Sequence, residues 1–277
     1  MTDGHTTKAN AFRQLHTGTK LLILPNAWDA GSARAIQECG FEAIGTTSAG
    51  IAFSNGFPDG QHIPFEYMLS RVRSIVRSVE VPVTVDMENG YSNNPITVEE
   101  NTRRLLEIGA VGINLEDGCP SQLKLAETEE QIKKIESVKR ASFSEGIPLF
   151  INARIDTYWL KNIEQSDRYQ ETVSRAKVYL EAGADGIFVP GISDLSLMSQ
   201  LAEVIQAPLN VLAGGQTPSA QAISVTGVSR LSIGSGFYRA SVSYLKMISM
   251  ELRSEGSISS HLRDAISYQV MNDEYFN

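Results

Sequence analysis

Short apolar runs rich in β-branched residues recur along the chain, and segments with a helical pattern separate most of them. The runs are too short for helices and are bounded by turn-forming residues, which is typical of buried strands. The segments between them carry apolar residues at the period of an amphipathic helix. The pattern therefore predicts strands at Leu21–Leu24, Ala43–Thr46, Val81–Val85, Gly112–Leu115, Leu149–Ala153, Gly186–Val189, Leu209–Leu212 and Arg230–Ile233.

The joints between helix and strand repeat one formula. The stretches ECGFEAIG, EIGAVGINL and EAGADGIFV each place a glycine just past a predicted helix, where a left-handed cap is favoured. An apolar strand follows each glycine after a short turn. The helices predicted in this way are Ala30–Cys39, Phe65–Ser78, Val98–Ile108, Glu129–Phe143 and Gln170–Glu181.

Strands that alternate with helices in this number predict an α/β protein with a closed (β/α)₈ barrel, the TIM-barrel fold. The alternative is an open doubly wound sheet, but no G-x-G-x-x-G motif follows the first strand. No low-complexity stretch or linker divides the chain. We therefore expect a barrel domain over residues 1–242 and a helical extension over residues 243–277 that packs on a neighbouring subunit.

Composition narrows the classes of partner. The 277 residues carry a net charge of −8, which argues against nucleic acid or an anionic membrane as the main partner. No apolar run is long enough to span a bilayer, and the polar start MTDGHTTKAN lacks the apolar core of a signal peptide. Two cysteines are too few for a disulfide scaffold. We expect a cytoplasmic protein, in which an anionic metabolite would be bound through a metal ion or a buried arginine.

Acidic side chains follow two neighbouring predicted strands, where a (β/α)₈ barrel carries its chemistry. In VTVDMENGY a buried strand ends in Asp86, Glu88 and a glycine turn, and the next strand leads into Asn114, Glu116 and Asp117. Clustered acids repel one another and resist burial, so this placement indicates a bound cation. Oxygen ligands suit Mg²⁺ or Mn²⁺, whereas zinc would favour His or Cys, and no histidine lies at a predicted strand end.

The fifth strand supplies a cation beside these acids. It leads into Asn152, Arg154 and Asp156, and the planar guanidinium of Arg154 is suited to a substrate carboxylate. Single acids at strand ends are often helix caps or turn formers. Asp29, Asp117 and Asp156 therefore stay open between such a role and a role in the site.

Small residues mark three further strand ends. The stretch Gly45–Gly50 presents backbone N–H groups that suit an anion. The glycines of AGGQT and IGSGF follow the seventh and eighth strands, where many barrels bind phosphate, although the same glycines also serve simple turns. Cys39 is expected in the core and His62 on the surface, and Cys119 lies close enough to the acids to leave a chemical role open.

At these residues the chain resembles the isocitrate lyase/phosphoenolpyruvate mutase superfamily. The matching stretches are LPNAWDAGSARAIQECGFEAIGTTSAGIA, VPVTVDMENGY, GINLEDG and INARIDTY, in that order. Each motif alone is weak, but the four together are specific, and the resemblance extends from Leu21 to about Val211. It implies a (β/α)₈ barrel whose last helix is exchanged between subunits, giving homodimers or homotetramers.

The resemblance also implies which residues hold the metal and the substrate. Mg²⁺ is expected on Asp86, with Glu88, Glu116 and Asp59 acting mainly through metal-bound waters; Mn²⁺ is the other suitable ion. The substrate is expected to be a small 2-oxo or 2-hydroxy carboxylate. Its expected binding residues are Thr47, Ser48, Ala49, Gly50, Asn114 and Arg154, of which Ser48 and Arg154, together with Glu116, are the expected catalytic residues.

The chain departs from the family lyases at the loop after the fourth strand. Those enzymes carry K-[KR]-C-G-H, whose cysteine protonates the departing carbanion, whereas this chain has GCPSQLKL with Lys124 near that place and Cys119 too early. Glu88 also replaces the usual Asp. We expect a Mg²⁺-dependent lyase that cleaves a C–C bond beside the oxygen-bearing carbon, by decarboxylation or retro-aldol reaction, through a metal-stabilised enolate. The alternatives are P–C bond chemistry on phosphonopyruvate and non-catalytic binding of a 2-oxo acid.

Overall fold

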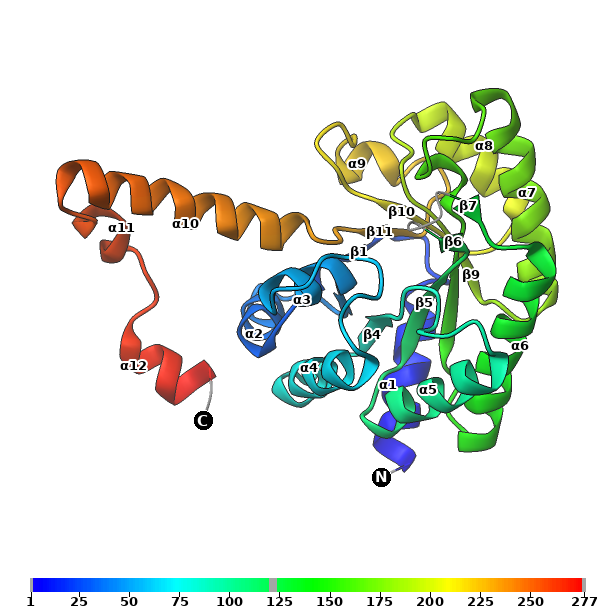
Figure 1. Ribbon diagram of the computed structural model, residues 1–277, viewed down its shortest axis with the longest axis horizontal. Helices are drawn as coiled ribbons and strands as arrows, with labels where there is room; N and C mark the ends of the chain where they lie inside the picture. Colours follow the sequence, from blue (N-terminus) through cyan, green and yellow to red (C-terminus); the bar gives the residue numbers. More distant parts are fainter. Residues whose placement is uncertain (1, 120–123, 276–277) are drawn as a thin grey trace.

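A parallel sheet that curls into a nearly closed barrel forms the centre of the molecule (Figure 1). The computed structural model describes residues 2–119 and 124–275. The strands neighbour one another in the order β1-β11-β10-β9-β8-β5-β4-β3-β2, and every pair of this sheet is parallel. Their bounds are β1 Leu22–Leu24, β2 Asn26–Ala27, β3 Ile44–Thr46, β4 Val83–Asp86, β5 Gly112–Glu116, β8 Phe150–Arg154, β9 Gly186–Val189, β10 Leu209–Leu212 and β11 Arg230–Ser232.

The strands β1 and β2 are two halves of one first strand, separated by Pro25, which has no N–H to donate to a ladder. The first half pairs with β11 and the second with β3, so this strand joins the two edges of the sheet. Asn26 reinforces the joint. Its Oδ1 accepts from the N–H groups of Ile233 and Gly234 at 2.9 and 2.8 Å, and its Nδ2 donates to Thr46 O at 2.8 Å. The predicted (β/α)₈ barrel and its strands are thus confirmed.

Helices cover the outside of the barrel, and the five predicted ones are all present. The structure adds α1, α3, α8 and α9, which the pattern did not predict. Cys39 was expected in the core, and this is wrong: it caps the C-terminus of α2, where the chain turns toward solvent, and is exposed, as is His62. The helix bounds are α1 Thr2–Gln14, α2 Ala30–Glu38, α3 Ser48–Ser54, α4 Phe65–Ser78, α5 Pro95–Glu107, α6 Thr128–Glu145, α7 Gln165–Glu181, α8 Leu195–Ile205 and α9 Ala220–Ile223.

The first helix closes the N-terminal end of the barrel. Phe12 is fully buried and meets the ring of Phe150 edge-on, and the ring of His16 stacks on Phe150 with 3.9 Å between centroids. Arg13 fixes the helix there, because its Nη2 lies 2.6 Å from Oδ1 of Asp185, just before β9. The opposite end of the barrel, where the strands terminate, is left for the site.

The C-terminal segment leaves the barrel as an arm (Figure 1). Helix α10 (Gly236–Glu255) contains no buried residue, and α11 (Ser259–Arg263), α12 (Tyr268–Val270) and a π-helical turn (Met271–Tyr275) follow it. The helix crosses the expected boundary between residues 242 and 243 without a break. Within the described chain, no helix is long and apolar enough to cross a membrane.

A small antiparallel hairpin stands beside the barrel mouth. It pairs β6 (Gly118–Cys119) with β7 (Lys124–Leu125). The side chain of Cys119 and residues 120–123 lie outside the described part of the chain, so the open role of Cys119 stays untested. Lys124 is exposed.

Candidate active site

A cavity of about 240 Å³ opens at the C-terminal ends of the strands. The strand register explains why polar side chains gather there, because Asp86 on β4 is level with Asn114 on β5, and Glu116 is level with Arg154 on β8. The structure brings together every predicted site residue except Gly50. The lining residues are Asn26, Thr47, Ser48, Ala49, Asp59, Gly60, Asp86, Glu88, Asn114, Glu116, Arg154, Trp159, Phe188, Leu212, Ser232, Gly234 and Ser235.

Asp86 is held by one of its two carboxylate oxygens. Oδ2 accepts from the hydroxyl of Ser48 at 2.8 Å and from its backbone N–H at 3.3 Å. The Asp86 backbone N–H donates to Oγ1 of Thr46 at 3.0 Å, which fixes the end of β4. Oδ1 is buried and has no hydrogen-bond partner in the described structure. Asp86 therefore presents one oriented, unsatisfied anionic oxygen.

Glu88 occupies a strained and buried position at the turn after β4. Its φ of 50° lies in the left-handed region that residues other than glycine rarely adopt, and the φ of Tyr91, 58°, lies there as well. The hydroxyl of Tyr91 donates to Glu88 Oε1 at 3.1 Å. Burial, followed by the charges of Asp86 and Asp59, raises the pKa of Glu88 to about 8. The fold thus holds this carboxyl where its charged form is disfavoured.

Arg154 is already engaged by acids of the protein itself. Its Nη1 lies 2.7 Å from Glu116 Oε2, and its Nε and Nη2 contact the two carboxylate oxygens of Asp156 at 2.6 and 3.1 Å. Burial lowers the pKa of Arg154, but Asp156 and Glu116 raise it further, so the net shift is upward. The bidentate contact of Arg154 is therefore made with Asp156. A ligand can accept only from the hydrogens on Nη1 and Nη2 that do not already contact Glu116 or Asp156.

Two further acids of the cavity, Glu116 and Asp59, also have raised pKa values. Burial is the main cause of the raised pKa of Glu116, which the Arg154 charge opposes. Burial and the Asp86 charge raise the pKa of Asp59. Four acids and a single lining cation, Arg154, thus share one small cavity. Such a cluster is typical of sites that bind a cation.

The donor set fits a hard cation held mainly by one carboxylate. Within residues 2–119 and 124–275, no group of three or more His, Cys, Asp and Glu side chains forms a ready-made metal-binding set. The unsatisfied Oδ1 of Asp86 is the atom that would serve as a direct ligand. A cation that keeps several waters, as Mg²⁺ does, would reach the other acids through those waters.

The stretch after β3 contributes one free backbone donor. Thr47 caps α3, and its hydroxyl accepts from the N–H of Gly50 at 3.2 Å, while the N–H of Ser48 is directed at Asp86. Ala49 lines the cavity, and its N–H has no partner among the described contacts. Gly50 has a packing role, because a Cβ there would lie 2.6 Å from Cγ2 of Thr47.

Two of the acids left open by the sequence support other parts of the structure. Asp29 caps α2 by accepting from the N–H of Ser32 at 2.7 Å. Asp117 is fully buried, and its Oδ2 accepts from Arg175 at 3.1 Å and from the hydroxyl of Tyr179 at 2.9 Å. Burial raises the pKa of Asp117 to about 6, although Arg175 opposes the shift. These two acids are structural.

Asp117 nevertheless reaches the site indirectly. Its Oδ1 accepts from the backbone N–H of Asp156 at 3.0 Å, and Asp156 in turn orients Arg154. The side chain of Asp156 needs the space beside Gly118, where a Cβ would lie 2.1 Å from its Oδ2. The E-D-G and A-R-x-D motifs therefore pack against each other, because Asp117 and Gly118 of the first contact Asp156 of the second.

Sequence reasoning missed several lining or supporting residues. Trp159 and Phe188 flank Arg154, with their ring centroids 5.7 and 5.6 Å from the guanidinium carbon. Arg230, on β11, is buried below the cavity, and its Nη2 donates to Asn114 Oδ1 at 3.2 Å. The signal for Arg230 was visible, because a charged residue opens the predicted strand RLSI.

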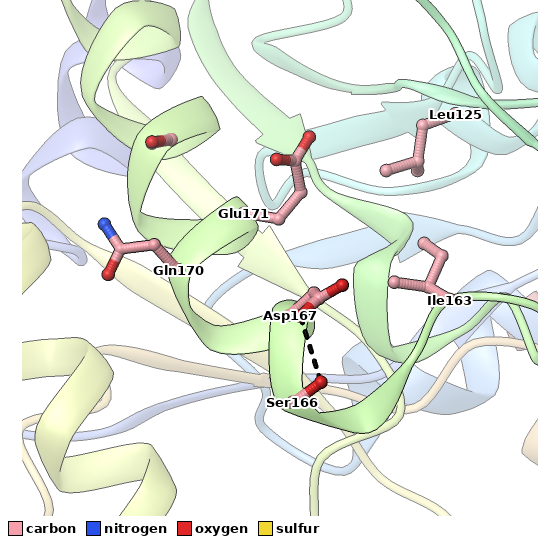
Figure 2. A pocket seen from close by; sticks show the side chains of 7 residues that line it. Leu125, Ile163, Ser166, Asp167, Gln170 and Glu171 are labelled. Carbon is pink, nitrogen blue, oxygen red and sulfur yellow. Dashed lines mark hydrogen bonds between the residues drawn. The ribbon is translucent and has the colours of Figure 1, made fainter.

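A larger hollow lies beside α7 (Figure 2). Its volume is about 560 Å³, and it is lined by Leu125 and Ile163 together with polar residues of α7. Ser166 donates to Asp167 at 2.9 Å, and Glu171 pairs with Arg175 at 2.6 Å. Its acids already have partners within the protein, so the barrel-mouth cavity is the stronger candidate.

Comparisons with known proteins agree with this architecture. Residues 12–253 match the family model described as phosphoenolpyruvate phosphomutase. The chain is 36% identical over 230 residues to an uncharacterized protein of Mycobacterium tuberculosis H37Rv, covering 83% of this chain and 84% of that one. It is 31% identical over 221 residues to the 2,3-dimethylmalate lyase of Eubacterium barkeri, covering 76% and 73%.

The solved structures extend the likeness to three dimensions. A protein of Burkholderia cenocepacia J2315 superposes with a TM-score of 0.89 at 33% identity, covering 98% of this chain and 96% of that one. Among the sequence relatives, the 2-methylisocitrate lyase of Aeropyrum pernix is 30% identical over 215 residues, covering 74% of this chain and 66% of that one. The named sequence relatives are lyases, and the named structural neighbours include a mutase, a lyase and, at 20–22% identity, an oxaloacetate acetylhydrolase. The chain belongs to the isocitrate lyase/phosphoenolpyruvate mutase superfamily.

Proposed function

We propose that this protein is a Mg²⁺-dependent lyase that cleaves a C–C bond in a small 2-oxo or 2-hydroxy carboxylate, beside the oxygen-bearing carbon. The observation that carries the proposal is the unsatisfied Oδ1 of Asp86 in a cavity with three further acids and Arg154. A bound divalent cation would take up the negative charge that develops on the substrate oxygen as the bond breaks. Asp86 would hold it, with Asp59, Glu88 and Glu116 around it.

The chain's own groups bind and orient the substrate in this proposal. The free N–H of Ala49 and the remaining Nη hydrogens of Arg154 suit the oxygens of a carboxylate. Ser48 fixes Asp86 in one rotamer through its hydroxyl. Trp159 and Phe188 cover two sides of the Arg154 guanidinium, and reduced contact with water there would strengthen its electrostatic interactions.

Replacing Asp86 tests the proposal. Asp86→Asn keeps an acceptor for Ser48 but removes the charge that a cation needs. We expect Mg²⁺ binding to be lost in calorimetry and kcat/KM to fall about a thousandfold or more. Asp194→Asn is a matched control, because Asp194 also follows a barrel strand but only caps α8, accepting from Leu197 N–H at 2.7 Å. Full activity in Asp86→Asn would contradict the proposal.

A substrate panel separates lyase activity from the alternatives. The wild-type protein with Mg²⁺ is incubated with oxaloacetate, 2-methylisocitrate, 2,3-dimethylmalate and phosphonopyruvate, and products are followed by proton and phosphorus NMR. Turnover of one of the first three supports the proposed lyase. A new phosphorus signal would instead indicate P–C chemistry, and oxalate binding without any turnover would indicate a binding protein.

A further inference from the structure

Arg230 is a buried cation in the middle of the barrel. It is 1% exposed, and its Nη2 donates to Asn114 Oδ1, which also accepts from Asn152 Nδ2 at 2.9 Å. Its Nε and Nη1 have no partner in the described structure. A buried arginine with two unsatisfied nitrogens lowers the stability of the fold unless another interaction offsets the loss of hydration. The protein therefore contains a buried arginine that reduces its stability, and packing alone does not explain why.

The surroundings of Arg230 are polar but carry little charge. Asn210, its register partner on β10, leaves both side-chain polar atoms unpaired, and Oγ1 of Thr84 on β4 is unpaired as well. His16 below is neutral at ordinary pH, because burial and then the Arg230 charge lower its pKa to about 3. The nearest source of negative charge is thus above Arg230, in the cavity.

The route from Arg230 to the acids is short. Asn114, which accepts from Arg230, lines the cavity and is the register partner of Asp86. Burial lowers the pKa of Arg230 to about 9, and the charge of Asp86 acts in the opposite direction. Arg230 consequently stays positively charged at neutral pH, beneath a cavity that four acids line with Arg154 as their one lining cation.

We propose that Arg230 is a positioning residue of the site, a fixed cation that fixes Asn114 from below, offsets the clustered acids and weakens their affinity for a divalent cation. This inference rests on the proposed Mg²⁺ function and adds how the protein sets its metal affinity. Without bound metal, Arg230 makes the acid cluster tolerable. With metal bound, the two positive charges repel each other, so the ion is held less tightly than the acids alone would hold it.

The test is the Mg²⁺ dissociation constant of full-length variants, measured by isothermal titration calorimetry. Arg230→Met removes the charge, and we expect Mg²⁺ to bind about fivefold to tenfold more tightly. Arg230→Lys keeps the charge and should stay within about twofold of wild type. A purely structural role would give equal or weaker binding in Arg230→Met, and either result in folded protein would overturn the inference.

A second variant covers the case in which Arg230→Met does not fold. Asn210→Asp places a carboxylate on the neighbouring strand, level with Arg230, and neutralises it while adding a partner for its free nitrogens. It should also tighten Mg²⁺ binding, whereas Asn210→Leu, which changes polarity but not charge, should not. Unchanged affinity in folded Asn210→Asp would overturn the inference.

The result also separates this inference from the proposed function. If wild type and the charge-removing variants both bind no Mg²⁺, both ideas fail. If wild type binds no Mg²⁺ but Arg230→Met or Asn210→Asp does, the inference stands and the proposed function fails. If wild type binds Mg²⁺ with the same affinity as these variants, the proposed function stands and the inference fails.

Discussion

At the scale of single residues, the site is built from groups that the surrounding fold holds in unfavourable states. Glu88 combines a left-handed backbone with 3% exposure and two acidic neighbours, Asp86 and Asp59. Backbone strain and buried like charges each reduce stability. Such groups persist where their state serves binding or catalysis, and a cation would relieve the electrostatic part of the strain.

Glu88 should lose a proton when a cation binds. Because its pKa in the folded protein is about 8, above the ordinary 4.5, folding takes up a proton between these values, and stability falls as pH rises through that window. At pH 7 we therefore expect Mg²⁺ binding to release protons. Calorimetry in Hepes and in Tris, which differ in ionisation enthalpy, should give different binding enthalpies for wild type. The difference should shrink in Glu88→Gln; equal enthalpies in wild type would contradict this.

At the scale of elements, the turn after β5 and the end of β8 depend on each other. Gly118 has no side chain, and this lets Asp156 approach and hold the fork of Arg154. The two strands are neighbours in the sheet, so a change on one is felt directly at the end of the other.

Gly118→Ala should therefore damage the site more than the fold. The new Cβ would displace Asp156, and we expect kcat/KM to fall on the order of a hundredfold because Arg154 moves. Overpacking of this kind lowers stability by about 1–3 kcal/mol, which thermal unfolding would detect. Gly215→Ala is the control, since a Cβ there meets nothing within 4 Å and should be silent. An active Gly118→Ala would mean that Arg154 does not need Asp156.

The sequence was informative about elements wherever periodicity and burial coincide. The strands on both sides of the site were predicted because they are continuous buried runs. Helix α3 was not, since it begins inside the small-residue stretch at Ser48, where no amphipathic pattern develops. Helix α1 was missed because its residues are mostly polar, and Ala9 and Phe12 are the buried ones among residues 4–14.

The site itself was predictable in composition but not in pairing. Motif order placed Asp86, Glu116 and Arg154 at adjacent strand ends. Two contacts depend on side-chain geometry that the spacing of residues in the sequence does not reveal. They are the bidentate contact of Arg154 with Asp156 and the contact of Arg230 with Asn114. The loop that distinguishes family members includes residues 120–123, which lie outside the described chain.

At the scale of the whole molecule, the arm is the feature that the barrel does not account for. Large apolar side chains are exposed along α10 over its full length. A monomer rarely leaves such a surface uncovered, so we propose that the arm packs on a second copy of the chain. The exposed apolar residues of α10 are Phe237, Val242, Tyr244, Leu245, Met247, Met250 and Leu252.

Charges on the arm should dissociate the assembly. Leu245→Glu with Leu252→Glu adds two carboxylates to one face of α10, and light scattering coupled to gel filtration should show a shift from dimer or tetramer to monomer. Circular dichroism should stay native, because the barrel core does not include these residues. Lys246→Gln, on the same helix, should leave the mass unchanged. A monomeric wild-type protein would refute the arrangement.

The joint at Asn26 has a consequence for how the protein is made. It links the first strand to Ile233 and Gly234, which lie 207 and 208 positions further along the chain. During synthesis the β1 half of the first strand therefore stays unpaired until β11, its partner in the sheet, has left the ribosome. Contacts so distant in sequence form slowly, which exposes an open sheet edge to aggregation. The need for chaperones during translation should therefore depend on when the first and last strands pair and close the barrel. In a circular permutant whose termini lie elsewhere, a different pair of strands would close the barrel last, and the unpaired edge would lie between those strands.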